Sequence, residues 1–440
     1  MNKKSMGKLF FTLCFILILS LSSFSFYNND KYQDMQNFKK ILEDKSSLDF
    51  KIFSSNIDFN KFLLENLIDY KNNESIFYSP FGIQVLFSYL LNGISGQSLK
   101  ELKRFLFYES FNIDAINNYY KMVLQKILDD KVVSLKFGNS FWLNKGSDLY
   151  KDVNLKGLKL ISEDFLTIAK KYYYMDIFEE DLLKESGFKL IEKWVSKKTE
   201  NKIKSLFDKR IINKDTIAIL LNALYFHENW ATPFDIKNTK TDEFTTLDDK
   251  KVKIDFMNFS SPKKLLYYED DSIQVVRLPY DKFKNSLIIF LPKELRKTKE
   301  TLNLIFSKDY IRILEKMQPL EGYVKFPKIS CEYKYELNDI LQKSGLISIF
   351  NPSLDFYPLF NKEIKGINEE LFKIDKVFQK TYLKIDEKGT TAASATGVSI
   401  IKVTTSIEKK IFYFIADHPF FYFLIDERSG NIIFTGFYNG

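Results

Sequence analysis

The sequence has few of the side chains that form catalytic centres or crosslinks. Its 440 residues include two histidines, His227 and His418, and two cysteines, Cys14 and Cys331. It also lacks a G-x-S-x-G nucleophile elbow, a Walker phosphate loop and a paired-cysteine metal motif. We therefore expect no enzyme activity, no cofactor and no metal site.

Glycine and proline are also few, at 16 and 10 residues, which leaves little room for low-complexity linkers. By contrast, 45% of the residues are hydrophobic, and 43 Phe and 25 Tyr supply bulky groups for a large core. The net charge is a mild +8. A basic stretch over residues 197–210 is interrupted by Glu200 and Asp208. We interpret this stretch as a solvated helix face, and nucleic-acid binding has no support.

Residues 1–25 have the features of a secretory signal peptide. Three lysines precede an apolar run over residues 9–19, and a small-x-small cleavage site follows at residues 23–25. The run is short for a bilayer span, which favours cleavage over retention as a membrane anchor. Cleavage would remove Cys14 and leave Cys331 without a disulfide partner. We expect a secreted, extracellular protein, or a periplasmic one in a Gram-negative host, with no membrane attachment after cleavage.

The rest of the chain changes pattern twice. Residues 26–52 are polar and lack sustained apolar periodicity, which predicts a flexible lead-in. Residues 53–440 begin with apolar residues at helical spacing, and from about residue 216 the apolar runs have strand length. The last two runs, Pro419–Asp426 and Asn431–Phe437, are expected to be central strands. Because helices precede strands without regular alternation, we predict one α+β domain.

One stretch before these last strands is unusual. Gly389–Ile401 contains thirteen consecutive uncharged residues, mostly small or β-branched, and the next charge is Lys402. Such residues can be exposed without a large apolar patch and can also enter a sheet without overpacking. Composition alone favours an ordinary exposed linker or an edge strand.

Two motifs give this stretch a context. The first motif, Asp386–Thr396, begins three residues before the uncharged stretch and includes its first eight residues. Its sequence, Asp-Glu-Lys-Gly-Thr-Thr-Ala-Ala-Ser-Ala-Thr, resembles the hinge of inhibitory serpins. Phe414–Leu424, followed by Gly430–Gly436, resembles the C-terminal signature of the same family. Shorter matches follow the family's order: Ile76–Pro80, Gly93–Gly96, Asn139–Trp142, Trp194–Val195, Asn201–Ile203, Asn222–Phe226, Trp230, Pro233–Phe234, Thr239, Leu278–Tyr280 and Phe326–Lys328.

The resemblance covers about residues 53–440 and implies the serpin fold. That fold has about nine helices and three β-sheets, with a reactive-centre loop exposed at about residues 387–410. The resemblance also implies a monomer whose partner is a target serine protease, with a cysteine protease as an alternative target. The protease would attack the loop and form an acyl-enzyme. The cut loop would then enter the main sheet as a strand and trap the protease in a covalent complex.

The hinge that the resemblance implies consists of Glu387, Gly389, Thr390, Ala392, Ala393, Ser394, Ala395 and Thr396. Counting from Glu387 as in inhibitory relatives places the reactive bond between Val403 and Thr404, which would suit an elastase-like enzyme. Cleavage after Lys402 is the alternative and would suit a trypsin-like enzyme. A back-count from the C-terminal signature leaves cleavage near Glu408 open as well.

The resemblance also implies a region that controls opening of the main sheet, formed by Ser79, Asn222, Trp230 and Lys325. Lys325 stands where we expect a buried histidine of the family, and Gly82 replaces a usual serine. Asn222 would then need another hydrogen-bond partner. The alternative function is that of a non-inhibitory serpin, which serves as a binding, carrier or chaperone protein.

Overall fold

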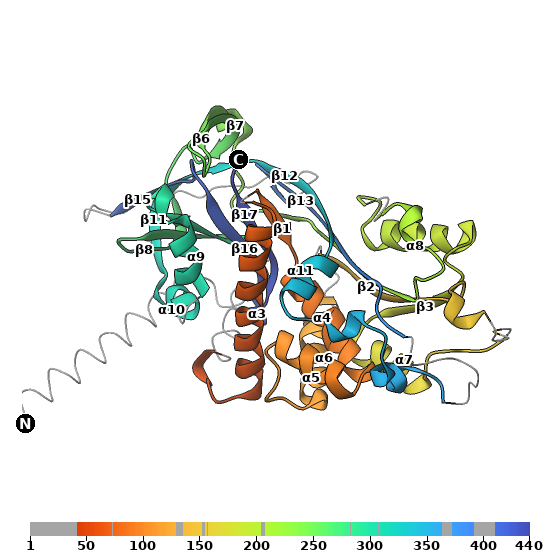
Figure 1. Ribbon diagram of the computed structural model, residues 1–440. Coiled ribbons are helices and arrows are strands. Elements are labelled where there is room, and N and C mark those ends of the chain that lie inside the picture. The colour runs from red at the N-terminus through yellow and green to blue at the C-terminus, as the bar shows by residue number, and fades with distance from the viewer. Residues whose placement is uncertain are drawn as a thin grey trace, which may run out of the picture.

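The computed structural model describes residues 42–440 apart from residues 73, 129–134, 152–154, 156, 204–206, 282, 307–308, 363–371 and 391–409. The expected signal peptide and most of the expected lead-in therefore lie outside the described residues, as does most of the loop. Within the described part the chain is a mixed assembly of helices and two large sheets (Figure 1). Among the helices described, none is both long and apolar enough to cross a bilayer.

The main sheet has seven strands, and its order is β3-β2-β4-β13-β14-β5, with β12 paired to β13. Its strands are β2 (Leu135–Asn144), β3 (Asp176–Glu180), β4 (Ala218–Phe226), β5 (Glu228–Asn229), β12 (Ile329–Glu336), β13 (Lys376–Asp386) and β14 (Gly389–Thr390). The two central strands β4 and β13 are parallel neighbours, with residues 219–225 opposite residues 376–382.

Alternating residues of β4 face two different layers. Ile219 and Leu221 pack in one apolar cluster with helix α8 (Glu185–Lys198). Leu220 and Leu224 face the opposite side and join the large core that includes helix α4 (Pro80–Leu90). Both faces of the main sheet are therefore covered at β4, and every residue of this strand is buried.

The remaining helices surround this sheet and the second one, and α4 lies on the face of the main sheet opposite α8 (Figure 1). They are α3 (Leu48–Tyr70), α4 (Pro80–Leu90), α5 (Gly96–Phe105), α6 (Ile113–Leu128), α7 (Glu163–Ile168), α9 (Thr298–Phe306), α10 (Asp309–Lys316) and α11 (Asn338–Lys343). Helix α3 begins at Leu48, and Ile52 and Phe53 are fully buried. The expected flexible lead-in over residues 26–52 is therefore wrong in its last five residues.

The second sheet has ten strands, and its order is β1-β17-β16-β10-β9-β8-β11-β7-β6, with β15 paired to β11. Its strands are β1 (Ile76–Tyr78), β6 (Lys240–Thr245), β7 (Lys251–Asn258), β8 (Lys263–Glu269), β9 (Ile273–Pro279), β10 (Asn285–Pro292), β11 (Gln318–Pro327), β15 (Ile411–Ile415), β16 (Phe420–Asp426) and β17 (Ile432–Tyr438). The last two strands are buried inside it, as the sequence predicted.

Three separate sheets were expected, and the described residues form two hydrogen-bonded sheets. Strand β11 pairs with β8 through residues 318–322 and with β7 through residues 325–327. This one long strand joins the group β6, β7, β11 and β15 to the six strands from β8 to β1. The third expected sheet is therefore continuous with the second.

Candidate functional site

The first two residues after the β13 turn already lie at one end of the main sheet. Gly389 and Thr390 form β14, which pairs with residues 385–386 of β13 on one side and with β5 on the other. Strand β5 follows β4 after a single residue. The start of the loop is thus held between β13 and the continuation of β4, directly beyond the point where these two strands pair with each other.

Thr390 is fully buried in this position. Its Oγ1 lies 2.8 Å from the hydroxyl of Tyr280, whose ring stacks on Trp230 at 4.5 Å between centroids. Burial raises the pKa of Tyr280 above its ordinary value, so this hydroxyl stays neutral. A small hydroxyl side chain therefore fits here with its hydrogen bond satisfied, whereas a charged one would have to be desolvated.

Gly389 permits the close approach of β14 to β5. Its φ is +151°, and a Cβ at this position would lie 2.2 Å from the carbonyl oxygen of Glu228 and 2.6 Å from Cα of Asn229. Any other residue would push β14 away from β5. The glycine of the hinge motif is thus required by the backbone contact that starts this strand.

Glu387 and Trp230 anchor the turn that precedes β14. The Glu387 carboxylate accepts a hydrogen bond from Thr239 Oγ1 at 2.6 Å and forms an ion pair with Lys328 at 3.1 Å. Trp230 donates from Nε1 to the carbonyl of Asp386 and from its backbone N–H to that of Lys388, both at 2.9 Å. These contacts fix the direction in which the chain enters the sheet.

The charge of Glu387 makes a pH-dependent contribution to this anchor. Burial alone would raise its pKa, but the hydrogen bond from Thr239 and the charge of Lys328 outweigh it, and the pKa lies below the ordinary value. A lowered carboxylate pKa adds stability above the unfolded-state pKa, near 4.3, and this stability is lost as the pH falls through the folded-state pKa.

We therefore expect Glu387→Gln to lower the free energy of unfolding by about 1–2 kcal/mol at pH 7. The difference from the unsubstituted protein should shrink as the pH falls from about 5 to about 3, where Glu387 itself becomes protonated. Urea unfolding at several pH values measures both quantities. A difference that stays constant over this range would contradict the anchoring role of the carboxylate.

A second group of buried polar side chains crosses the β4–β13 pair in the middle of the sheet. Gln379 of β13 donates from Nε2 to Oδ1 of Asn222 on β4 at 2.6 Å. The same amide exchanges two hydrogen bonds of 2.9 Å with the backbone of Ser79. Asn222 in turn donates to Asn139 of β2. Each of these four residues is at most 1% exposed, so the network is satisfied without water.

Ser79 connects this network to helix α4 and to the second sheet. Its Oγ caps the helix by accepting from the N–H of Gly82 at 3.0 Å, and it donates to the carbonyl of Ile433 at 2.6 Å. A Cβ on Gly82 would lie 2.5 Å from the side chain of Asn222. The replacement of the usual serine by Gly82 therefore gives Asn222 the room that it occupies.

Gln379→Ala should destabilise the protein strongly. It would leave the backbone N–H and carbonyl of Ser79 and Oδ1 of Asn222 without their partner inside the core, and we expect a loss of about 3 kcal/mol in the free energy of unfolding, measured in urea. Thr381→Ala is the matched control, because Thr381 lies on the same strand and makes one buried bond, to the carbonyl of Phe77 at 3.1 Å. It should cost about 1 kcal/mol. Equal losses of unfolding free energy in the two variants would show that the Gln379 network stabilises the protein no more than a single buried hydrogen bond.

The structure brings together only part of the predicted site. Ser79 and Asn222 belong to the buried network, and Trp230 contacts the hinge turn. Lys325 does not join them, and its expected place beneath the main sheet is wrong. It lies on β11 of the second sheet, where its Nζ pairs with Asp242 at 2.5 Å and sits 4.5 Å from the ring centroid of Phe256. The residue that completes the network is Gln379.

The remaining predicted site residues lie outside the described residues. These are Ala392, Ala393, Ser394, Ala395 and Thr396 of the hinge, and Lys402, Val403 and Thr404 of the reactive bond. Gln379 and Tyr280 also belong to the site, although no motif in the sequence marks either as a functional residue. An available signal for Gln379 was an uncharged polar residue within the strand-like run Lys376–Asp386.

Three features of this structure can be compared with known proteins. They are a main sheet with two parallel central strands, a loop that begins between the ends of these strands, and a buried amide network that crosses them. A family model described as Serpin (serine protease inhibitor) matches residues 54–439. The chain belongs to the serpin family. Neuroserpin of Gallus gallus is 27% identical to it over 376 residues, which cover 83% of this chain and 86% of neuroserpin. Serpin B11 of Homo sapiens is 26% identical, covering 87% and 97%.

Solved serpin structures agree with this assignment. The native state of the thermophilic serpin tengpin matches with a TM-score of 0.75 and 25% identity, covering 88% of this chain and 94% of tengpin. Human thyroxine-binding globulin, solved as a complex, matches with a TM-score of 0.73 at 23% identity. The serpin fold predicted from the sequence is thereby confirmed. Serpins are generally protease inhibitors, although some members are non-inhibitory.

Proposed function

We propose that this serpin is a secreted suicide-substrate inhibitor of serine proteases that traps its target by inserting the cut loop between β4 and β13. The observation that carries the proposal is β14, where Gly389 and Thr390 already pair with β13 and β5 at the entrance to the β4–β13 pair. A strand that starts there can lengthen by adding residues one at a time, without a new nucleation step.

The registers on the two sides of β14 support this path. Thr390 lies opposite Ile385 of β13 and Glu228 of β5. Counting onward in both registers would place residues 391–401 between residues 374–384 of one strand and residues 217–227 of the other. These two predicted alignments agree with the observed pairing of β4 with β13, in which Ile219 lies opposite Lys376. The inserted strand would therefore fit both neighbours without a register shift.

The composition of the loop matches the surroundings that this register gives it. Residues 391–401 carry no charge, and the first charged residue is Lys402. The even-numbered residues from Thr390 onward would face the core that contains Leu383 and Val377. Thr396 would come to lie between Gln379 and Asn222, where its hydroxyl could replace the hydrogen bond that these two amides now make with each other.

The proposal includes the finer features expected from the sequence. The chain acts as a monomer that is exported by its N-terminal segment, needs no cofactor and is not itself an enzyme. The reactive bond is Val403–Thr404, with cleavage after Lys402 as the alternative. The non-inhibitory alternative has support in the serpin family as a whole, and the composition of the hinge weighs against it.

Incubation with a panel of elastase-like and trypsin-like serine proteases tests the proposal. The expected result is a covalent complex that survives denaturing electrophoresis, together with a released peptide that begins at Thr404, or at Val403 if the cut follows Lys402. A protease whose catalytic serine is replaced by alanine is the control and should give no such complex. Cleavage of the loop by every protease without any complex would favour the non-inhibitory alternative.

A further inference from the structure

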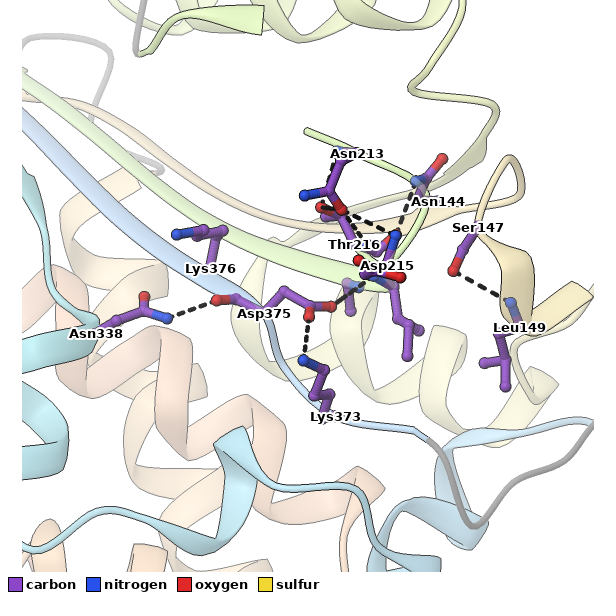
Figure 2. A network of polar contacts seen from close by, with 12 residues as sticks. Asn144, Ser147, Leu149, Asn213, Asp215, Thr216, Asn338, Lys373, Asp375 and Lys376 are labelled. Carbon is purple, nitrogen blue, oxygen red and sulfur yellow. Dashed lines mark hydrogen bonds and ion pairs between the residues drawn. The ribbon is translucent and has the colours of Figure 1, made fainter. Parts of the chain in front are cut away.

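One carboxylate ties the start of β13 to the start of β4, at the end of this pair opposite the hinge. The side chain of Asp375, one residue before β13, accepts hydrogen bonds from the backbone N–H groups of Ile217 at 2.5 Å and Ala218 at 3.1 Å. The N–H of Asp375 donates to the carbonyl of Ala218 at 3.0 Å. Figure 2 shows Asp375 at the centre of this polar network.

Neighbouring residues hold the carboxylate in place. Lys373 forms an ion pair with its Oδ1 at 3.0 Å, and the side chain of Asp375 is 8% exposed. Asn338 of α11 donates to the backbone carbonyl of Asp375 at 2.5 Å and accepts from the N–H of Val377 at 2.9 Å. Bonds from backbone N–H groups to a buried, oriented carboxylate are stronger than those between neutral groups.

Near the start of β4, the edge that faces β2 has other hydrogen-bond partners. Asn144 of β2 donates from its backbone to the carbonyl of Ile217 and from its side chain to that of Thr216, both at 2.8 Å. Contacts on the β2 side can therefore persist while β4 and β13 separate. The contacts of Asp375 cannot, because they join the two strands that have to move apart.

We propose that Asp375 is a latch that must open before the loop can complete its insertion. This inference rests on the proposed function. In the register that continues from β14, Ile400 comes to lie opposite Asp375, just before β13, and opposite Ala218 on β4. Residues 391–399 can enter while the Asp375 bonds remain intact, but Ile400 and Ile401 come to lie opposite Ala218 and Ile217, whose N–H groups the carboxylate occupies. Asp375 is thus a positioning residue for the last step of insertion.

The latch separates the early part of insertion from its end. The Gln379–Asn222 bond lies in the middle of the pair and opens when Thr396 arrives, whereas the Asp375 bonds open only for the last residues of the uncharged run. In the uncut protein the latch keeps the β4–β13 pair closed at the end that the hinge does not reach. In the inhibitory reaction it sets the rate at which the protease is carried through its final displacement.

Two synthetic peptides that compete with the loop test the latch without any protease. A long peptide with the sequence of residues 391–401 reaches Asp375 in the continued register, and a short one with residues 391–397 ends before it. Binding of dye-labelled peptides is followed by fluorescence in the unsubstituted protein, in Asp375→Asn and in Asp355→Asn. Asp355 is a matched control, because its carboxylate also accepts a backbone bond, from Ser98 at 2.7 Å, away from β4 and β13.

We expect Asp375→Asn to bind the long peptide about tenfold faster than the unsubstituted protein, the factor that one charge-assisted hydrogen bond supplies. The rate at which Asp375→Asn binds the short peptide should stay within about twofold of the rate for the unsubstituted protein. Asp355→Asn should bind both peptides at the unsubstituted protein's rates. Equal acceleration of both peptides would show general loosening and would overturn the latch alone. An unchanged rate for the long peptide would also overturn it. Failure of both peptides to bind any variant would overturn the insertion mechanism itself, together with the latch.

Discussion

Cleavage of the loop should raise the melting temperature of this serpin by roughly 15–30 °C, the shift typical of about 5–10 kcal/mol of added stability. The physical reason is the new strand, which forms hydrogen bonds on both edges, to β4 and to β13, and buries one of its faces in the core. In the uncut protein these two strands pair with each other over only seven residues each. Insertion would replace this one pairing with two longer ones, along both edges of the new strand.

The measurement uses a protease that cuts the loop and is not trapped. After the protease is removed, the cut and uncut proteins are compared by scanning calorimetry at the same rate, because unfolding of such proteins can be irreversible. As a control, the loop-cut Thr390→Glu protein should show a much smaller increase. An unchanged melting temperature after complete cleavage of the unsubstituted protein would contradict strand insertion.

Thr390→Glu should convert the inhibitor into a substrate. Thr390 is fully buried against Tyr280 and lies directly opposite Glu228, which is itself buried. A glutamate here would bury a charge beside a like charge, at a cost of several kcal/mol. Since about 1.4 kcal/mol in a barrier changes a rate tenfold, insertion should fall behind hydrolysis of the acyl-enzyme. An arginine would be a weaker test, because Glu228 could neutralise it.

The readout is the fraction of protease that enters the covalent complex per loop cleaved, which should fall at least about tenfold. Two variants serve as controls. Thr390→Ser keeps the hydroxyl that meets Tyr280 and should still inhibit. Lys388→Glu replaces a positive charge with a negative one two residues earlier, at an exposed position, and should also inhibit. Full trapping by Thr390→Glu would contradict the role of β14 as the start of insertion.

Features that depend on contiguous residues could be predicted from the sequence. The resemblance of residues 386–396 to the serpin hinge predicted the start of the inserting strand there, and the structure gives Gly389 and Thr390 the close backbone contact and the burial that a glycine and a small hydroxyl side chain permit. The two C-terminal runs were predicted as central strands because they are apolar throughout, and both are buried.

The sequence was less informative where partners lie far apart along the chain. Gln379 contacts Ser79, which is 300 positions away, and Asn222, which is 157 away, so nothing near Gln379 indicates its partners. Lys325 was placed by resemblance alone and lies in the other sheet. The start of α3 was also predicted too late, because its first turn is partly exposed and shows little apolar periodicity.

The number of sheets depends on a detail of pairing that no pattern in the sequence contains. The bonds of β8 to residues 318–322 of β11 decide whether the second and third sheets are separate or continuous. Alternation of apolar residues predicts that a strand exists and which face is buried, but it does not predict the neighbour along each part of a long strand.

A crystal structure of the loop-cut protein tests the central claim most directly. The account predicts a new strand of residues 391–401 between β4 and β13, with Ile400 opposite Asp375 and Ala218. The spacing of β4 and β13 should then increase from one strand separation, about 4.8 Å, to two, about 9.6 Å. A cut protein in which Ile219 still pairs with Lys376, with the loop outside the sheet, would contradict the account.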